Sequence, residues 1–164
     1  MKKIIIIGCP GAGKSVFSRK LKDILNIPLY HLDMLYHNSD GTHITRDELI
    51  QKLNEIFKEK EWIIDGNYQR TIELRLKQCD TVFLLDFPTE VCLAGAESRV
   101  GTQRKDMPWV EEKLNSEFKN TILEFKNDKL PEIYNMLDNY KDKLNIVIFK
   151  SREEIENYLN SLKI

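Results

Sequence analysis

A glycine-rich segment close to the start of the chain has the residue types and the spacing of a phosphate site. Gly8, Gly13, Lys14 and Ser15 fit the pattern G-x-x-x-x-G-K-[ST], which is the phosphate-binding P-loop. Its glycines let several backbone N–H groups point at one anion, and the following helix adds the positive end of its dipole. In this pattern the lysine reaches the β- and γ-phosphates and the hydroxyl binds Mg²⁺. The predicted nucleotide contacts are Gly8, Cys9, Pro10, Gly11, Ala12, Gly13, Lys14, Ser15 and Val16.

Three aspartates each follow a short apolar run, at the point where a strand would end. Asp65 can hold the water shell of Mg²⁺ beside Ser15, or it can be a turn residue, because Asp-Gly is a common turn pair. Asp86 competes for the metal, although it can also cap a helix. Asp33 can accept a proton or a hydrogen bond from an acceptor hydroxyl, or it can cap a short turn. We predict Ser15 and Asp65 as metal ligands and Asp33 as the residue that contacts the acceptor.

Three arginines are candidate phosphate clamps, because guanidinium groups stabilise the charge of a transferring phosphoryl group. Arg99 and Arg104 flank Gly101 and Thr102 in a polar stretch that we interpret as a flexible lid. Arg70 follows the Asp65 turn and can grip an acceptor. An isolated arginine is more often a solvated surface residue, so their placement is the argument. The predicted catalytic residues are Lys14, Asp33, Arg99 and Arg104.

The elements that must position these residues alternate along the chain. We expect strands over residues 4–7, 28–32, 62–64, 81–85 and 145–149. We expect helices over residues 14–26, 46–60, 89–99, 110–125, 131–140 and 151–162, with a short one near 74–76. This alternation predicts an α/β, three-layer P-loop nucleoside triphosphate hydrolase fold with a five-stranded parallel sheet, helices on both faces and a short helical lid. Ligands of such sheets bind beyond the carboxyl ends of the strands, where the P-loop and the aspartates fall. We predict one domain over 1–164, with a lid at about 99–109 and an acceptor-side region at about 33–60.

Composition narrows the class of protein. The chain has 164 residues, 41% hydrophobic and 31% charged, with a formal net charge of −1. This balance gives no global positive field for nucleic acid or an anionic membrane. No stretch approaches the roughly 18 apolar residues of a membrane span, and the run Ile4–Ile7 is too short for a signal peptide. Cys9, Cys79 and Cys92 share no metal-ligand spacing, so we expect free thiols and a cytoplasmic protein. We assign the three histidines no role.

Five stretches of the chain resemble one branch of the P-loop proteins. They are Gly8–Ser15, Tyr30–Asp33, Trp62–Tyr68, Leu85–Pro88 and Arg104–Met107. Together they make the chain similar to nucleoside-monophosphate kinases and, more narrowly, to the bacterial DNA topology modulation proteins, a family related to adenylate kinases. The third and fifth stretches point to the narrower family. The resemblance covers essentially the whole chain.

The resemblance implies roles for several residues. In adenylate kinases the segment that matches Asp65–Arg70 reads Asp-Gly-Phe-Pro-Arg, with the aspartate near Mg²⁺ and the arginine on the monophosphate. It implies those roles for Asp65 and Arg70 here, with Tyr68 also on the substrate side. This chain has Asn-Tyr-Gln where the family has Phe-Pro, which is one residue more. Asp33 resembles the strand-end aspartate of shikimate-kinase-like enzymes, which contacts an acceptor hydroxyl.

The leading hypothesis is therefore a small-molecule kinase that uses ATP and Mg²⁺, with a nucleotide or a hydroxyl-bearing metabolite as acceptor. ATP would lie on Gly8–Ser15 below the arginine lid, and the acceptor between Asp33, the loop at 36–43 and Arg70. The alternative is a nucleotide-binding regulatory protein with weak ATPase activity, which the family name would link to DNA topology. A GTPase switch is disfavoured because no Asn-Lys-x-Asp segment occurs. Direct binding to DNA is disfavoured by the charge.

Overall fold

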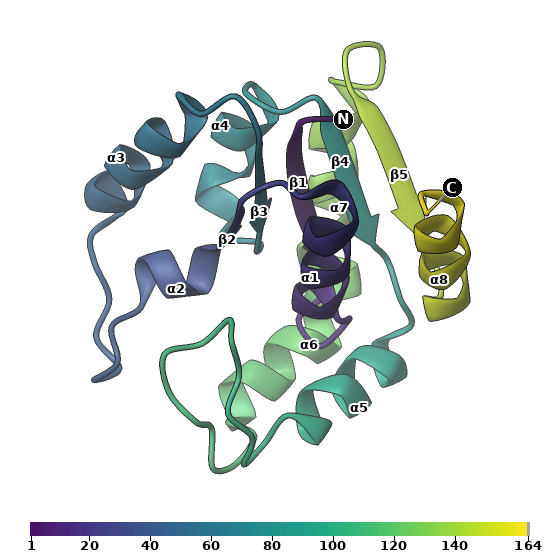
Figure 1. Ribbon diagram of the computed structural model, residues 1–164. Helices are drawn as coiled ribbons and strands as arrows, with labels where there is room; N and C mark the ends of the chain where they lie inside the picture. Colours follow the sequence, from purple (N-terminus) through teal and green to yellow (C-terminus); the bar gives the residue numbers. More distant parts are fainter. Residues whose placement is uncertain (164) are drawn as a thin grey trace.

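The computed structural model describes residues 1–163 and contains one five-stranded parallel sheet with the order β2-β3-β1-β4-β5 (Figure 1). The strands are β1 (Lys3–Gly8), β2 (Leu29–His31), β3 (Trp62–Asp65), β4 (Thr81–Leu85) and β5 (Asn145–Phe149). All four neighbouring pairs are parallel. The predicted fold class and all five predicted strands are confirmed.

The P-loop comes directly after the strand at the centre of the sheet. Ile4, Ile5, Ile6 and Ile7 of β1 are fully buried, because β3 and β4 flank this strand and helices cover both faces. A strand covered on both faces is an unbroken apolar run rather than an alternating one, and β-branched isoleucine suits it. The central position places the P-loop between the strand ends of β3 and β4.

The helices are α1 (Lys14–Leu25), α2 (Leu32–Tyr36), α3 (Arg46–Phe57), α4 (Ile72–Leu76), α5 (Thr89–Ser98), α6 (Ser116–Asp128), α7 (Leu130–Asp138) and α8 (Arg152–Ser161). A 3₁₀ turn, Gln69–Thr71, precedes α4. Helices α1 and α8 lie on one face of the sheet, and α6 and α7 lie on the other (Figure 1). The predicted capping box at the start of α3 is present: the Thr45 hydroxyl accepts from the Glu48 N–H, and the Glu48 carboxylate accepts from the Thr45 N–H.

Two sequence expectations about these elements were wrong. The strand predicted over 28–32 ends at His31, and a short helix, α2, begins at Leu32, so Asp33 lies in a helical turn rather than at a strand end. Leu32, Leu35 and Tyr36 contact the core at helical spacing, but five residues are too few to reveal that period.

The helix predicted over 110–125 begins only at Ser116, where the Asn115 side chain accepts a hydrogen bond from the Glu117 N–H and caps the helix. The segment between α5 and α6 is therefore a loop over residues 99–115, longer than the 99–109 segment predicted as a lid, and the prediction of a short helical lid was wrong because this segment contains no helix. The Gly101 N–H donates to the Glu111 carbonyl at 2.5 Å, which closes this loop on itself.

Candidate functional site

The P-loop connects β1 to α1 through a turn that depends on glycine. Gly13 adopts a φ of 98° immediately before the first residue of α1, a conformation that side chains with a Cβ disfavour. Gly11 lies against α5: a Cβ on Gly11 would fall 1.9 Å from the Cys92 carbonyl oxygen, and one on Gly95 would fall 2.1 Å from the Gly11 carbonyl oxygen. The loop is thus shaped by its backbone and packed directly onto the backbone of α5.

The predicted nucleotide-binding residues divide into two groups. A cavity of about 170 Å³, here called the P-loop cavity, is bordered by part of the loop together with β3, α2 and the 99–115 loop. The loop residues that border it are Pro10, Gly11, Gly13, Lys14 and Ser15. Gly8, Cys9 and Ala12 are buried and do not border it, and Val16 is half exposed and borders a second cavity, the basic cavity described below.

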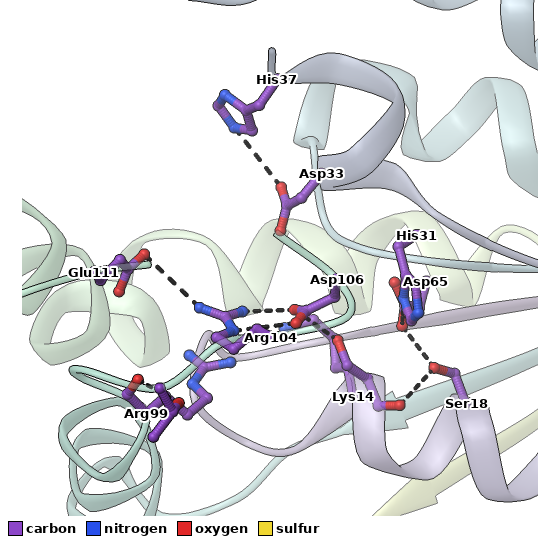
Figure 2. A network of polar contacts seen from close by, with 12 residues as sticks. Lys14, Ser18, His31, Asp33, His37, Asp65, Arg99, Arg104, Asp106 and Glu111 are labelled. Atoms are coloured by element: carbon purple, nitrogen blue, oxygen red, sulfur yellow. Dashed lines mark hydrogen bonds and ion pairs between the residues drawn. The ribbon is translucent and has the colours of Figure 1, made fainter. Parts of the chain in front are cut away.

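Lys14 borders the P-loop cavity, and Figure 2 draws it in one view with Asp65, Arg104 and Asp106. Its Nζ donates to the carbonyl oxygens of Gly8 at 3.0 Å and Cys9 at 3.2 Å. Burial lowers the pKa of Lys14, and the negative charges of Asp65 and Asp33 oppose that shift. A partly buried ammonium group held by neutral carbonyls can be satisfied further by an anion.

Asp65 is the last residue of β3, borders the P-loop cavity and is only 4% exposed. Its Oδ2 accepts a hydrogen bond from Ser18 Oγ at 2.6 Å and lies 2.9 Å from His31 Nδ1. Sequence analysis gave His31 no role, but in the structure it holds the Asp65 carboxylate from β2. Asp65 is therefore a fixed carboxylate beside the P-loop (Figure 2).

Asp86, the competing candidate for the metal, is not among the residues that border the P-loop cavity. Its Oδ2 accepts a hydrogen bond from the Tyr134 hydroxyl at 2.6 Å and another from the Lys150 ammonium group. These contacts join the end of β4 to α7 and to the segment after β5. Pro88, not Asp86, precedes α5 as its N-cap residue. Of the two aspartates, only Asp65 is positioned to act at the P-loop.

A polar network from the 99–115 loop reaches the P-loop (Figure 2). Asp106 is 6% exposed, and its Oδ2 accepts a hydrogen bond from Ser15 Oγ at 2.8 Å. Arg104 donates to both carboxylate oxygens of Asp106, at 3.0 Å and 2.5 Å, and lies 3.7 Å from Glu111. Burial raises the pKa of Asp106, but the bonds from Arg104 and Ser15 outweigh burial and lower that pKa to about 2. Asp106 is therefore an ionised carboxylate at neutral pH.

Arg99 follows α5 directly and borders the P-loop cavity together with Arg104. Burial, and then the positive charge of Arg104, lower the pKa of Arg99. Its Nε is buried and has no hydrogen-bond partner among the described residues. Both predicted lid arginines are thus brought to the P-loop, and Arg99 has donors available for a ligand.

A basic cavity of about 470 Å³ lies between the P-loop, α5 and the 99–115 loop. Five basic side chains border it, against one acidic side chain, Asp106. The basic residues are Arg19, Arg99, Arg104, Lys105 and Arg152. Such a wall attracts polyanions, because fields from like charges add within a recess.

An acidic cavity of about 430 Å³ lies on the other side of Arg104, between α2, the 99–115 loop and α6. Asp33, Glu111 and Glu117 contribute carboxylates, and Arg104 is its one arginine or lysine. Trp109, Phe118 and His37 supply rings, with the rings of His37 and Trp109 packed edge to face at 5.2 Å. Trp109 thus borders this cavity and is only partly buried.

Asp33 and Arg104 border both the P-loop cavity and the acidic cavity. The Asp33 side chain is 52% exposed, with its Oδ1 3.9 Å from His37 Nε2. Burial by the surrounding walls nevertheless raises the pKa of Asp33, and the charge of Lys14 opposes that shift. Asp33 therefore lies where a group in the acidic cavity would meet a phosphate on the P-loop.

The two remaining substrate-side predictions separate in the structure. Tyr68 borders the P-loop cavity, and its ring lies 4.7 Å from that of Tyr36. Arg70 is exposed in the 3₁₀ turn and borders none of the three cavities just described.

Two further residues that sequence analysis missed shape this region. The Asn67 side chain accepts from the Gly8 N–H at 3.0 Å and donates to the Gly8 carbonyl at 2.6 Å, which fastens the turn after β3 to the P-loop. Arg75 is fully buried and donates to the backbone carbonyls of Gly66, Asn67 and Thr71. Burial lowers the pKa of Arg75 to about 10. The sequence signal for Arg75 is a charged side chain between two leucines, Leu74 and Leu76, whereas Asn67 is marked only by its place in the Trp62–Tyr68 stretch.

Comparisons with known proteins identify distant relatives of this chain. No family model matches the sequence. Adenylate kinase from Thermotoga maritima is 30% identical over 111 residues, which cover 65% of this chain and 50% of that protein. Adenylate kinase from Thermotoga petrophila is 31% identical over 97 residues, which cover 57% and 43%. The chain spans about half the length of the curated relatives it matches, and these adenylate kinases are distant homologues.

Solved structures share the fold. A gluconokinase from Sinorhizobium meliloti superposes with a TM-score of 0.55, and a shikimate kinase from Bacteroides thetaiotaomicron with one of 0.56. Each is 16% identical, and the match covers 98% of this chain and 91% or 95% of the other. The chain therefore has a P-loop kinase fold. Within residues 1–163, no helix is long and apolar enough to cross a membrane.

Proposed function

We propose that this chain is an ATP- and Mg²⁺-dependent small-molecule kinase that transfers the γ-phosphate to a nucleotide or a hydroxyl-bearing metabolite. The observation that carries the proposal is the P-loop cavity, where Lys14, Asp33, Arg99 and Arg104 converge from separate elements. This cavity shares residues with a larger basic cavity on one side and an acidic cavity on the other. The distant relation to adenylate kinases supports the same reaction class.

The donor nucleotide would bind with its phosphates on the P-loop and extend into the basic cavity. Lys14 and the backbone N–H groups of the loop would hold the β- and γ-phosphates. Arg99 and Arg104, carried by the 99–115 loop, would stabilise charge on the transferring group and exclude water. This loop would act as the lid of a single domain over residues 1–164.

The acceptor would bind in the acidic cavity and present its hydroxyl to Asp33. A carboxylate with a raised pKa accepts a proton more readily at neutral pH than an ordinary aspartate does. Three carboxylates in the wall oppose a second polyanion, so a neutral or cationic acceptor is favoured over one with several negative charges. Tyr68 would border the reacting groups, and the acceptor-side region would comprise α2 and the segment to about residue 60.

The site has the oxygen ligands that Mg²⁺ requires. The Ser15 hydroxyl and the Asp65 carboxylate border the P-loop cavity, and Mg²⁺ binds hard oxygen donors together with substrate phosphates and water. Ser15 and Asp65 would hold the ion. When bound, Mg²⁺ neutralises charge on the phosphates and so favours attack by the acceptor oxygen.

A coupled assay of ADP formation over a panel of acceptors tests this function. The panel contains nucleoside monophosphates, neutral polyols and amino alcohols, each at saturating MgATP. We expect at least one acceptor to raise turnover about tenfold or more above the basal ATPase rate, given typical kinase rates. Tight ATP binding with no acceptor-stimulated turnover would reject the kinase and support a nucleotide-binding regulatory protein.

A further inference from the structure

We propose that Asp106 completes the Mg²⁺ site through the Ser15 hydroxyl, so that metal binding and the closed position of the 99–115 loop depend on each other. The inference rests on the proposed function only in taking a Mg²⁺–polyphosphate complex as the ligand. In many P-loop sites the carboxylate that supports Mg²⁺ lies at the end of a strand, whereas here that carboxylate would lie in the 99–115 loop.

The first support is the contact between Ser15 and Asp106. A serine hydroxyl has one hydrogen to donate and two lone pairs. If a lone pair binds the metal, the hydrogen needs an acceptor, and a carboxylate is the strongest one available. Ser15 Oγ already donates to Asp106 Oδ2 at 2.8 Å. Partners that orient a metal ligand in this way usually set its affinity for the metal.

The second support is the capacity that Asp106 retains. A carboxylate has about four acceptor positions. Arg104 fills two of them and Ser15 a third, which leaves Oδ1 able to accept one more hydrogen bond. Mg²⁺ in proteins keeps several of its water molecules. Asp106 can therefore hold a metal-bound water while Arg104 keeps its charge fixed.

The third support is the state of the two strand-end aspartates. Asp65 Oδ2 is taken by Ser18 and His31, and Asp86 is bonded to Tyr134 and Lys150. The Ser15 hydroxyl is bonded to the carboxylate of the loop instead. The metal site would thus have a fixed part on β3 and a movable part on the loop. If Asp106 only neutralised the charge of Arg104 and so latched the loop, its removal would leave the affinity for the metal unchanged.

The test compares Asp106→Asn with Glu112→Gln, an exposed acidic residue of the same loop. Mn²⁺ binding in the presence of pyrophosphate or ATP is followed by electron paramagnetic resonance. Loop closure is followed by the emission of Trp109, against the constant signal of Trp62 in the core. We expect Asp106→Asn to weaken Mn²⁺ binding about tenfold or more and to remove the metal-dependent change in Trp109 emission. Glu112→Gln should leave the Mn²⁺ affinity and the change in Trp109 emission as they are in the unmodified chain. The affinity for ATP without metal should change less than about twofold in either variant, because the proposed role of Asp106 is in binding the metal.

Hydrogen exchange on the unmodified chain provides a second measurement that needs no variant. Adding Mg²⁺ to the nucleotide complex should slow exchange over residues 99–115 more than nucleotide alone does. Unchanged Mn²⁺ affinity in Asp106→Asn, or a rise in metal-free ATP affinity, would overturn the inference in favour of a latch. If Mn²⁺ binding with pyrophosphate depends on Asp106 but no acceptor raises turnover, the proposed kinase function would be rejected and this inference kept. If an acceptor raises turnover but Asp106→Asn leaves the metal affinity unchanged, this inference would be rejected and the proposed kinase function kept.

Discussion

The basic and acidic cavities differ in charge although they share a wall. They meet at Arg104, which borders both, and each is more than twice the size of the P-loop cavity between them. One presents five basic side chains and the other three carboxylates. A polyphosphate is attracted to the first and repelled from the second. If the chain is a kinase as proposed, this difference in charge would orient the donor relative to the acceptor.

The strongest test removes the lysine of the P-loop. Lys14→Ala should reduce acceptor-stimulated turnover by roughly three orders of magnitude, because Lys14 is the lysine that the P-loop pattern assigns to the β- and γ-phosphates and it borders the P-loop cavity. ATP affinity, measured by titration calorimetry, should fall with it. A variant that keeps the ATP affinity of the unmodified chain would contradict the assignment of the P-loop cavity to phosphate.

The next test separates the acceptor side from the donor side. Asp33→Asn should lower acceptor-stimulated turnover about 10²–10⁴-fold, because the amide cannot accept the hydroxyl proton, while ATP affinity stays within about twofold. In the unmodified chain, turnover should fall as the pH drops, with a midpoint above the ordinary aspartate value of 3.8, because burial raises the pKa of Asp33. Asp33→Asn should remove that acidic limb from the pH profile. A limb that persists would assign it to another group.

A matched pair of charge deletions then probes each cavity alone. Arg152→Gln in the basic cavity should raise the KM for ATP about three- to tenfold and leave the KM for the acceptor unchanged. Glu117→Gln in the acidic cavity should change only the KM for the acceptor, by a similar factor. Steady-state kinetics with each substrate varied in turn measures both. Equal effects of one deletion on both substrates would mean that the two cavities are not separate sites.

The smallest effect concerns the wall that the cavities share. The pKa of Asp106 is lowered to about 2. Its ion pair with Arg104 therefore stabilises the folded state at pH values above the ordinary aspartate pKa, and this stabilisation is lost as the pH falls from about 4 to about 2. The loss should be about 1–2 kcal/mol of unfolding free energy after allowance for solvent screening. Urea unfolding at several pH values measures it. Asp106→Asn should show a flatter dependence than the unmodified chain over that range.

The fold could be predicted from the sequence because each signal for it lies within a short segment of the chain. Each strand is a short apolar run, and the P-loop spacing requires a glycine turn and a helix directly after the first strand. The same logic placed Lys14, Arg99 and Arg104 near one another. It could not choose between Asp65 and Asp86, because both lie at the ends of buried strands, and only contacts with Tyr134 and Lys150 divert Asp86 from the site.

Long-range contacts account for the features that sequence reasoning missed. Asp106 meets Ser15 across 91 positions of the chain, and Asn67 meets Gly8 across 59, so no spacing rule connects them. The charge of each cavity is likewise assembled from distant segments, such as Arg19 with Arg152 and Asp33 with Glu117. Arg70, for which the resemblance implies a role on the acceptor, is exposed and borders none of the three cavities. The narrower resemblance to DNA topology modulation proteins stays a prediction.

The contact between Gly11 and Gly95 has a consequence for how such a chain can change over time. Neither position has room for a single added carbon, since each would collide with a carbonyl of the other segment. The P-loop and α5 must therefore vary together, and a substitution at one requires a shift of the other. The 99–115 loop begins just beyond this contact, and three of its side chains, Arg99, Arg104 and Asp106, border the P-loop cavity. If the chain acts as proposed, new acceptor preferences can arise by changing the other residues of this loop while these three side chains and the P-loop are kept.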